Sequence, residues 1–469
     1  MKLSSLTSES SVLSTDYFGD PEVARVVHDS RMVREGDLFC CIKGANTDGH
    51  LHAKAAVEAG AIAVLSEKVI SLRVPVVLVD SVRETMPNFA SKLVGDPSHE
   101  LQVVGVTGTN GKTSVVSLLA GILRKEDCRV ETIGTLNAGL TTPEAPELQR
   151  QLREYIKDNV EVVAMEVSSH SLVQHRVDAV SFSSVAFTNL SRDHLDYHSS
   201  MEEYYAAKKR LFKRGFSKKS VISIDDEYGL QQANDAVSEG LQVEKVSTKG
   251  INASFDKDSA AFDWRGERVL MPIGGPFVVA NALVAAELAF QLGFEVPVIS
   301  KALAVAEQVP GRFEVLKLKE NLNAIVDYAH TPEALEELLK GCRKIVSGRI
   351  ILIFGCGGNR DSGKRFLMGR TAELWADLKI VTSDNPRNED PMQIISDVLL
   401  GMTGKDLIIE EDREAAIRTA LISAKKDDLV VLAGRGHEEF QEVEGKKVPF
   451  SDKSVLLSCV GELQGPSKS

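Results

Sequence analysis

The segment TGTNGKTS at residues 107–114 has the residue types of a loop that binds phosphate groups. It follows an apolar, strand-like run at 101–106 and precedes a run whose apolar residues repeat at helical spacing. In that context glycines let backbone N–H groups face phosphates, Lys112 can reach the β- and γ-phosphates, and the hydroxyl of Thr113 can hold Mg²⁺. The segment departs from the general GxxxxGK[ST] pattern, because Val106 stands where the first glycine belongs. A plain glycine turn capped by threonine is the alternative, but the order strand, loop, helix favours a nucleotide site.

Two further strand-like runs end in side chains that could act beside that loop. The run at 160–165 leads to Glu166, which could coordinate the metal of a bound nucleotide or simply be a solvated carboxylate. The run at 184–187 leads into a loop that contains His194. Because parallel strands place their carboxyl ends along one edge of a sheet, Lys112, Glu166 and His194 are expected to converge on one crevice.

A lysine lies on the helix that we expect after this loop. Ser200 and Glu203 have the spacing of a capping box, which predicts the start of a helix that includes AAKKRLF at 206–212. From spacing alone, Lys208 is one of several surface cations on that helix. The alanines beside it permit a close approach by other elements but do not indicate a role.

Four strand-like runs in the last third of the chain are each followed by an unusual polar loop. These loops are 327–332, 355–361, 384–387 and 434–438. Ligands of open α/β sheets bind outside the carboxyl ends of the strands, so the loops are candidates for one site. Arg360, Arg387 and Glu438 would suit a zwitterion, with guanidinium groups for a carboxylate and a carboxylate for an ammonium group, unless the loops are unrelated. The second loop lacks the third glycine of GxGxxG, which makes it a weak dinucleotide site.

Apolar runs of strand length alternate with amphipathic stretches along nearly the whole chain, which predicts an α/β fold with parallel sheets covered by helices. Besides the runs above, we expect strands at 38–42, 61–65, 74–79, 324–326, 350–354, 379–381 and 429–433, and helices at 52–59, 281–292, from 332 and at 369–376. Turn-forming clusters at 95–98 and 309–312 divide the chain into three predicted domains, residues 1–97, 98–309 and 310–469.

Length, charge and cysteine usage exclude several classes of protein. The chain has 469 residues, and its 55 Lys and Arg against 67 Asp and Glu give a net charge of −12. An acidic chain argues against binding nucleic acid, and no apolar run approaches the ~20 residues of a membrane span or the core of a signal peptide. Six cysteines without a CxxC pair indicate reduced thiols. We therefore expect a cytoplasmic protein with no nucleic-acid or membrane partner.

Taken together, these strings resemble the Mur ligase family over essentially the whole chain. The strings that carry the resemblance are 29–31 with 36–39, 107–113, 141–144, 165–170, 174–176, 189–198, 327–332, 355–364, 384–391 and 434–438. The resemblance implies a smaller N-terminal α/β domain for the uridine end of the substrate and a central P-loop domain with a parallel sheet that binds ATP. It also implies a C-terminal Rossmann-like α/β domain for an incoming amino acid.

The resemblance further implies a reaction, the ligation of an acid and an amino acid. ATP would donate its γ-phosphoryl group to the D-glutamyl γ-carboxylate of UDP-N-acetylmuramoyl-L-alanyl-D-glutamate. The amine of meso-2,6-diaminopimelate would then attack the acyl phosphate and form an amide, releasing ADP and phosphate. Implied with this reaction are Mg²⁺ as cofactor, ATP as co-substrate, a role in peptidoglycan synthesis and so in cell shape and division, a bacterial cytoplasm, and a monomer whose partners are small molecules.

The residue roles that the resemblance implies form five groups. The catalytic residues are Lys112, Glu166, His194 and Lys208. The metal ligands are Thr113, Glu166, His194 and Lys208, the last as N6-carboxylysine, whose carbamate supplies anionic oxygens. The residues that bind ATP are Gly108, Thr109, Asn110, Gly111, Lys112, Thr113, Ser114, Asn281, Arg312, Asp327 and His330. The residues that bind the UDP-muramoyl dipeptide are Ser30, Ala45, Asn46, Thr47, Thr141, Thr142, Ser168, Gln174 and Arg176. The residues that bind diaminopimelate are Arg360, Asp384, Asn385, Pro386, Arg387, Gly434 and Glu438.

The identity of the amino acid depends on Arg387. Members of the family that add meso-diaminopimelate carry arginine there to pair with the distal carboxylate, and lysine would leave Arg387 without its partner. The alternatives are a lysine-adding ligase, a folylpolyglutamate-type ligase, and a nucleotide-dependent sensor of cell-wall precursors that makes no product. The loop that begins at Asp384 and the string at 29–31 speak against the first two. The complete set of expected catalytic residues speaks against a sensor.

Overall fold

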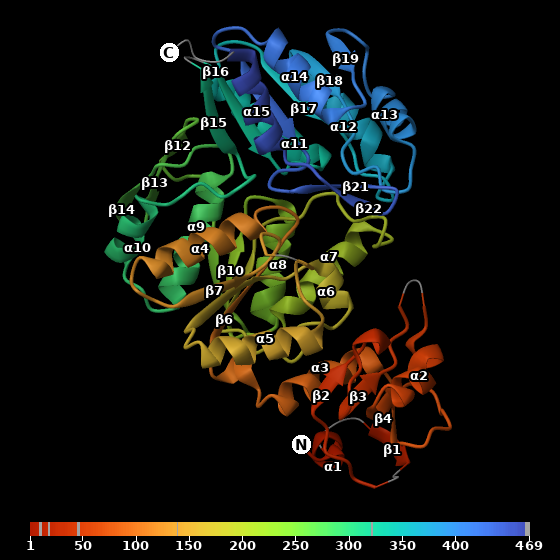
Figure 1. Ribbon diagram of the computed structural model, residues 1–469. Coiled ribbons are helices and arrows are strands. Elements are labelled where there is room, and N and C mark those ends of the chain that lie inside the picture. The colour runs from red at the N-terminus through yellow and green to blue at the C-terminus, as the bar shows by residue number, and fades with distance from the viewer. Residues whose placement is uncertain (9–11, 17–18, 45–46, 138, 320–321, 465–469) are drawn as a thin grey trace, which may run out of the picture.

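The computed structural model describes residues 1–469 apart from 9–11, 17–18, 45–46, 138, 320–321 and 465–469, and it contains three large sheets in chain order (Figure 1). The α/β class with three sheet-based domains is confirmed. The boundaries after residues 97 and 309 stay predictions. Within the described part of the chain, every helix is too short or too polar to cross a bilayer.

The N-terminal sheet has five strands in the order β1-β5-β4-β3-β2, in which β1 is antiparallel to β5 and the other neighbours are parallel. Its strands are β1 (Val12–Asp16), β2 (Arg25–Val27), β3 (Asp37–Cys40), β4 (Ala61–Ser66) and β5 (Val76–Val79). Its helices are α1 (Leu3–Thr7), α2 (Ala53–Glu58) and α3 (Val82–Leu93), with 3₁₀ turns at Ser30–Met32, Gly49–His52 and Pro97–His99. Successive side chains of β3 point to opposite faces, so Leu38 packs with α1 and α3, and Phe39 packs with α2.

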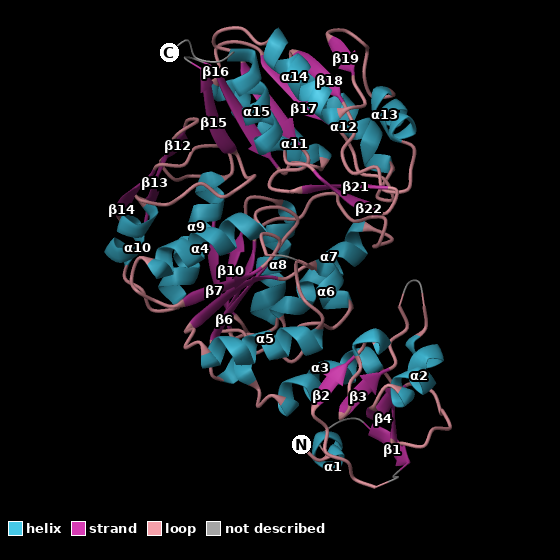
Figure 2. Cartoon of the chain, in the orientation of Figure 1, coloured by secondary structure: helices cyan, strands magenta, loops and turns pink. Residues whose placement is uncertain are grey.

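The central sheet has six parallel strands in the order β11-β10-β9-β6-β8-β7. They are β6 (Gln102–Thr107), β7 (Val130–Ile133), β8 (Val162–Glu166), β9 (Ser184–Phe187), β10 (Lys219–Ser223) and β11 (Gln242–Val246). The helices are α4 (Lys112–Arg124), α5 (Ala145–Lys157), α6 (Ser169–Val173), α7 (Met201–Lys209), α8 (Glu227–Ser238), α9 (Val278–Gln291) and α10 (Val296–Leu303), with a 3₁₀ turn at Arg210–Phe212. A three-stranded antiparallel sheet of β12 (Ala253–Phe255), β13 (Ala260–Trp264) and β14 (Glu267–Met271) lies beside α10 (Figure 1). Helices cover both faces of the large sheet, with α4 and α9 on the face of Val104 and α7 and α8 on the face of Val103 (Figure 2).

The C-terminal sheet has the order β15-β16-β20-β17-β18-β19, with β15 antiparallel to β16 and the remaining pairs parallel. Its strands are β15 (Glu314–Lys319), β16 (Leu322–Asp327), β17 (Ile350–Phe354), β18 (Leu378–Val381), β19 (Leu407–Ile409) and β20 (Leu429–Ala433). Its helices are α11 (Pro332–Ile345), α12 (Gly363–Trp375), α13 (Pro391–Leu399), α14 (Arg413–Ser423) and α15 (Asp452–Gln464). A separate hairpin of β21 (Phe440–Val443) and β22 (Lys446–Pro449) follows β20.

Three expected strands, 184–187, 350–354 and 429–433, have the same bounds in the structure. Other expectations were displaced. The helix of the phosphate loop already begins at Lys112, because Gly111 adopts φ 85° and caps the helix there. The helix expected at 369–376 begins six residues earlier, at Gly363. By contrast, the helix expected at 52–59 agrees with α2, at Ala53–Glu58, to within one residue at each end, and a 3₁₀ turn at Gly49–His52 precedes it.

Strand order determines where the functional side chains meet. Strands β9, β6 and β8 are adjacent and parallel, so the ends of all three lie at one edge of the central sheet. Strands β16, β20, β17 and β18 are adjacent in the same way, so the four polar loops of the last third share one edge of the C-terminal sheet.

Candidate active site

The loop between β6 and α4 is shaped by two glycines in the left-handed half of φ space. Gly108 has φ 151° and Gly111 has φ 85°. A Cβ atom at Gly111 would lie 2.5 Å from Oδ1 of Asn281 on α9, and one at Gly108 would overlap the hydroxyl of Thr188. The loop therefore needs glycine at both positions, and it places Asn281 directly against its backbone.

Lys112 lies over this loop at the start of α4. Its Nζ donates to the carbonyl oxygens of Gly108 at 2.9 Å and Thr109 at 2.8 Å. Burial lowers the pKa of the Lys112 ammonium, although the negative charges of Glu166 and Asp193 oppose that shift. A lysine so placed presents a positive charge beside the backbone N–H groups at the start of a helix, which is the arrangement that binds polyphosphate.

Glu166, the last residue of β8, is buried beside the same helix. Its Oε1 accepts a hydrogen bond from Oγ1 of Thr113 at 3.0 Å and from the backbone N–H of Thr135 at 2.8 Å. The hydroxyl of Thr135 donates to Oε2 at 3.1 Å. A Cβ atom at Gly134 would overlap this carboxylate, so the glycine makes room for it. Glu166 is thus a buried, positioned carboxylate rather than a solvated one.

Lys208 on α7 is 1% exposed, so the expectation from spacing that it is a surface cation was wrong. Its Nζ donates to the carbonyl of Gly108 at 2.8 Å and lies 4.5 Å from the centre of the Tyr204 ring. Burial holds the pKa of the Lys208 amine well below its usual range, and the nearby charge of Lys112 lowers it further. A neutral amine is the form that reacts with CO₂ to give a carbamate and a proton.

His194 and Asp193 follow β9 in one loop and meet side chains of the C-terminal domain. Nε2 of His194 lies 3.4 Å from Oδ2 of Asp193, and Nε2 of His330 lies 3.4 Å from the same oxygen. Nζ of Lys364 lies 3.9 Å from Oδ1 of Asp193. Burial lowers the pKa of His194 to about 3. Burial alone would raise the pKa of Asp193, but the hydrogen bond from His330 and the charges of His330, His194 and Lys364 outweigh it and hold that pKa well below the usual range.

Sequence reasoning gave no role to Asp193 or Lys364. Both lie in strings that carried the resemblance, but neither directly follows a strand, so strand-end position did not distinguish them. Their charge and their mutual distance across two domains are the features that mark them in the structure.

Unmodified side chains supply only some of the ligands that a hard cation such as Mg²⁺ needs at the expected metal site. Among the described residues, no three His, Cys, Asp or Glu side chains are grouped so that they could hold a metal ion. The carboxylate of Glu166 and the hydroxyl of Thr113 are adjacent, buried oxygen donors of the kind that Mg²⁺ prefers. Lys208 would add oxygen ligands only as a carbamate, and its burial and lowered pKa suit that modification.

A second group of expected site residues gathers beside Glu166. Thr142 donates its hydroxyl to the backbone oxygen of Glu166 at 2.9 Å and accepts from the N–H of Ser168 at 3.2 Å. Arg176 donates to the carbonyl of Thr142 at 2.8 Å and to Oε1 of Gln174 at 2.6 Å. The hydroxyl of Thr141 lies 3.5 Å from that of Thr135, so all five residues assigned to the dipeptide in this domain form one cluster.

Glu144, which had no expected role, connects this cluster to the N-terminal domain. Its Oε1 lies 3.0 Å from Nη2 of Arg176, and its Oε2 accepts from Nη1 of Arg83 on α3 at 2.7 Å. The only sequence signal was its place in the string 141–144, because no spacing rule relates it to Arg83.

The residues expected at the uridine end lie in the N-terminal domain. Ser30 begins a 3₁₀ turn that is capped by the side chain of Asp29. The hydroxyl of Thr47 lies 2.8 Å from Nε2 of His52. Ala45 and Asn46 lie outside the described residues.

Arg312, near the start of the C-terminal domain, contacts the phosphate loop, and Asp327 fixes the backbone nearby. Nη2 of Arg312 donates to Oγ1 of Thr113 at 3.1 Å, and its guanidinium lies 4.3 Å from the centre of the Tyr328 ring. The carboxylate of Asp327 accepts from the backbone N–H groups of Phe313 at 2.6 Å and Ala329 at 2.7 Å. Burial raises the pKa of Asp327. Asp327 therefore fixes the backbone at Ala329 and also that at Phe313, next to Arg312.

The polar loops of the C-terminal sheet meet at one place. Nδ2 of Asn385 donates to Oε2 of Glu438 at 2.8 Å, and Nη1 of Arg387 donates to the carbonyl of Gly358 at 2.8 Å. Burial and the charge of Asp384 raise the pKa of Glu438. The alternative of three unrelated loops is therefore wrong, since these loops contact one another.

Gly434, Pro386 and Arg360 lie beside the same group of loops. A Cβ atom at Gly434 would lie 2.6 Å from Oδ2 of Asp384, and one at Gly358 would overlap the carbonyl oxygen of Pro386. Nη1 of Arg360 lies 4.0 Å from Oδ2 of Asp196 in the central domain. Arg360 thus lies where the pocket faces the loop that carries His194.

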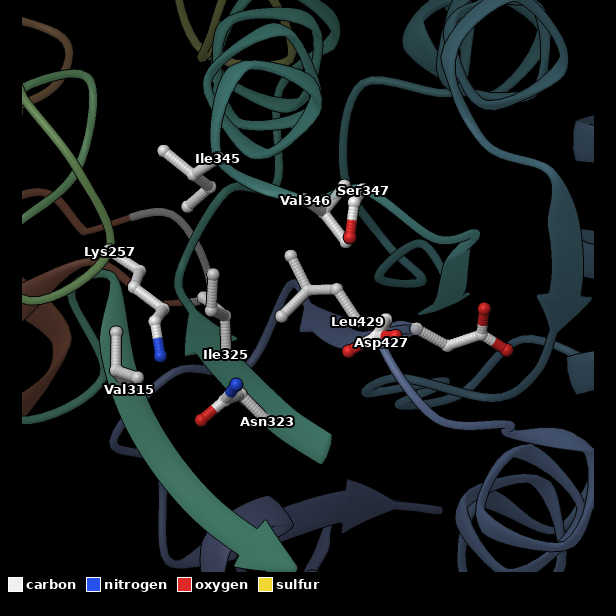
Figure 3. A pocket seen from close by; sticks show the side chains of 10 residues that line it. Lys257, Val315, Asn323, Ile325, Ile345, Val346, Ser347, Asp427 and Leu429 are labelled. Carbon is white, nitrogen blue, oxygen red and sulfur yellow. The ribbon is translucent and has the colours of Figure 1, made fainter. Parts of the chain in front are cut away.

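Two cavities lie away from the clusters of expected site residues. One of about 190 Å³ opens between the loop of Lys257 and the start of the C-terminal sheet, where Asn323, Ile325 and Leu429 line it (Figure 3). Another of about 210 Å³ lies between α3 and the segment 179–181. Both are remote from the strand ends that carry the expected chemistry.

Three family models of known proteins match this chain, one in the region of each large sheet. Residues 22–94 match the family model described as Mur ligase family, catalytic domain, residues 106–289 match Mur ligase middle domain, and residues 311–436 match Mur ligase, glutamate ligase domain. A protein of Aquifex aeolicus named UDP-N-acetylmuramoyl-L-alanyl-D-glutamate--2,6-diaminopimelate ligase is 41% identical, and the match covers 97% of each chain. A protein of the same name from Geobacillus kaustophilus is 39% identical over 98% of this chain and all of its own.

Solved structures agree with these relatives. One of a protein with the same name has a TM-score of 0.70 at 30% identity and covers both chains completely. A MurF structure from Acinetobacter baumannii has a TM-score of 0.64 at 20% identity and covers 89% of this chain and 91% of its own, which shows the shared fold.

Proposed function

The chain belongs to the Mur ligase family, and from this premise we propose that it is the ATP-dependent ligase that joins meso-2,6-diaminopimelate to UDP-N-acetylmuramoyl-L-alanyl-D-glutamate in peptidoglycan synthesis. One structural observation carries the proposal. Nη2 of Arg312 in the C-terminal domain donates to Thr113 of the phosphate loop at 3.1 Å, and Nε2 of His437 in the loop 434–438 lies 3.2 Å from the carbonyl oxygen of Thr135, whose N–H donates to Glu166. These contacts support a site shared by the two domains.

The first step is transfer of the γ-phosphoryl group of ATP to the D-glutamyl γ-carboxylate. A carboxylate oxygen forms the new P–O bond, the bond to the β-phosphate oxygen breaks, and ADP leaves. The backbone N–H groups of the loop, Lys112 and Arg312 stabilise the negative charge that builds up on the transferring group. Asn281, which lies against Gly111, and His330, which lies beside Asp193, are proposed to contact the nucleotide, with Asp327 holding the backbone of Phe313 and Ala329.

Magnesium would supply further neutralisation of the phosphate charge. Thr113, Glu166, His194 and Lys208 as N6-carboxylysine are the residues proposed to hold it. Glu166 is already positioned by Thr135, and burial holds the pKa of the Lys208 amine well below its usual range, which favours the neutral form that a carbamate requires.

The second step is attack of the amine of diaminopimelate on the acyl phosphate. A C–N bond forms, the C–O bond to phosphate breaks, and the amine loses a proton. Arg387 is proposed to bind the distal carboxylate, and Asp384 and Glu438 the distal ammonium group. Lysine lacks that carboxylate, so it would leave the remaining N–H donors of Arg387 without the ligand carboxylate that they are proposed to bind.

The muramoyl dipeptide is proposed to extend from Arg176, Thr142 and Ser168 toward the N-terminal domain. Ser30 and the segment around Thr47 would meet the uridine nucleotide there. We further propose that the chain works as a cytoplasmic monomer, and that its domains are bounded after residues 97 and 309.

The test is ATP-dependent phosphate release by the purified chain with the UDP-muramoyl dipeptide and either diaminopimelate, L-lysine or no amino acid, with products identified by mass. Turnover with diaminopimelate alone is expected. Turnover with lysine would keep the ligase and contradict the role of Arg387. ATP binding without any turnover would favour a sensor of cell-wall precursors.

A further inference from the structure

The hairpin after β20 supplies an extra strand beside the loop that carries Arg387. Arg387 forms a parallel β-bridge with Val443 of β21, and its backbone N–H donates to the carbonyl of Glu442 at 2.9 Å. Arg387 has φ 54°, a left-handed conformation that an arginine rarely adopts. The hairpin therefore holds the backbone of Arg387 in a conformation that the loop alone would not favour.

The side chain of Arg387 is held from two sides. Its Nε donates to Oε2 of Glu442 at 3.1 Å, and its Nη1 donates to the carbonyl of Gly358 at 2.8 Å. A guanidinium has five N–H donors, and these contacts use two of them. The remaining donors, including both on Nη2, are those with which a ligand carboxylate can pair.

The same strand sets the orientation of Asn385. Its Oδ1 accepts from the backbone N–H of Glu442 at 2.8 Å and from Nη1 of the buried Arg435 at 3.1 Å. Because both donors meet Oδ1, the NH₂ group of Asn385 must face Glu438, to which it donates at 2.8 Å. One residue of β21 thus positions two residues of the amino-acid pocket, one through its backbone and one through its carboxylate.

We propose that β21 is the specificity-determining element of the amino-acid pocket, and that Glu442 is a positioning residue that orients Arg387 toward a carboxylate at the far end of the amino acid. This inference rests on the proposed function, since it concerns how Arg387 comes to select diaminopimelate. The side chain of Glu442 is 42% exposed, so its charge is screened by water and its hydrogen bond to Nε is what matters.

The test compares Glu442→Ala, which removes the acceptor, with Glu442→Gln, which keeps an oxygen that can accept from Nε. Glu444→Gln is the matched control, because it makes the same charge change two residues away on an exposed side chain. Steady-state rates are measured with diaminopimelate and with L-lysine, and thermal melting checks that each variant is folded.

Glu442→Ala is expected to raise KM for diaminopimelate about tenfold, as for loss of one charge-assisted hydrogen bond, with kcat and KM for ATP nearly unchanged. Discrimination against lysine falls by a similar factor. Glu442→Gln and Glu444→Gln stay within about threefold of wild type. Wild-type KM in Glu442→Ala, an equal rise in Glu442→Ala and Glu442→Gln, or a loss confined to kcat would each overturn the inference. A wild-type chain that makes no diaminopimelate product would instead overturn the proposed function, and this inference with it.

Discussion

The two halves of the proposed site are built differently. At the edge of the central sheet, Thr113, Glu166 and Lys208 are all at most 5% exposed, and each is positioned by a regular strand or helix, whereas His194 lies on a loop with its side chain 37% exposed. At the edge of the C-terminal sheet, the expected residues all lie on loops; Asp384 and Asn385 are 7% exposed there, and the side chains of Arg360 and Glu438 are 50% and 30% exposed.

This difference corresponds to two physical tasks. Phosphoryl transfer depends on charges held in a water-poor site, where electrostatic stabilisation is strongest, and most of its expected groups are buried in the sheet framework. Recognition of a small zwitterion needs directional hydrogen bonds, which loops can supply when a neighbouring element fixes them. The central edge should therefore respond to substitution mainly in kcat, and the C-terminal edge mainly in KM and selectivity.

The largest effect is expected for Lys112→Ala at the central edge. Removing the lysine from the phosphate loop should lower phosphate release by at least about a thousandfold, because its positive charge on the transferring group is lost and Arg312 supplies only part of that stabilisation. Lys125→Ala, just beyond the end of the same helix, is the control and should keep nearly full activity. Both variants should fold, as circular dichroism would show. Turnover near the wild-type rate in Lys112→Ala would remove the phosphate-loop assignment.

The next largest effect is expected for Lys208→Met, which should lower activity but increase stability. Lys208→Met should lower turnover at least about a hundredfold through loss of the proposed metal ligand. In CO₂-free buffer at pH 7 it should also raise the free energy of unfolding by about 1–3 kcal/mol, because a buried amine is replaced by an apolar side chain. Denaturant unfolding measures this difference, and Lys209→Met, whose lysine pairs with Asp235 at 3.0 Å, is the control.

The pH dependence of that stability difference follows from the lowered pKa of Lys208. The unfolded chain binds a proton at this lysine over the range between the lowered folded pKa and the ordinary pKa of lysine, so wild-type stability rises with pH there. The gap between Lys208→Met and wild type should therefore narrow from pH 7 toward pH 10. A gap that widens with pH would contradict the buried neutral amine.

At the C-terminal edge, Arg387→Ala should act on binding rather than on chemistry. Loss of its pairing with the distal carboxylate should raise KM for diaminopimelate about 30- to 100-fold and leave KM for ATP unchanged. Arg370→Ala, an exposed arginine on α12, is the control. A fall in kcat with unchanged KM in Arg387→Ala would contradict the expectation that substitutions at the C-terminal sheet act mainly on KM.

The smallest effect is expected at the N-terminal domain. Arg83→Ala breaks the link from Arg83 through Glu144 to Arg176 and should raise KM for the UDP-muramoyl dipeptide about three- to tenfold. KM for diaminopimelate should not change, and Arg73→Ala, exposed on the same domain, should behave as wild type. Equal changes in both KM values would mean that the link affects the whole site and not the dipeptide alone.

The sequence predicted those strands and loops well whose pattern lies in a few consecutive residues. The strands at 184–187, 350–354 and 429–433 are short apolar runs bounded by polar segments, and they have the expected bounds. The phosphate loop was recognised because its glycines, lysine and threonine are consecutive and lie between a strand and a helix. Helix starts were predicted less well, because Gly111 and Ser362 begin their helices without the apolar periodicity that was used to locate them.

By itself, then, the sequence determined the α/β class, the strand ends and the residue types available at each of them. Only the tertiary structure decided which of those residues act together. Lys208 is a surface cation by spacing, and it becomes a buried amine because it meets Gly108, 100 residues away. Arg387 meets Glu442 across 55 residues, and Glu144 meets Arg83 across 61. Burial and pairing of charges depend on such distant contacts, and no local pattern specifies them, because a side chain's desolvation is set by whichever segments pack around it.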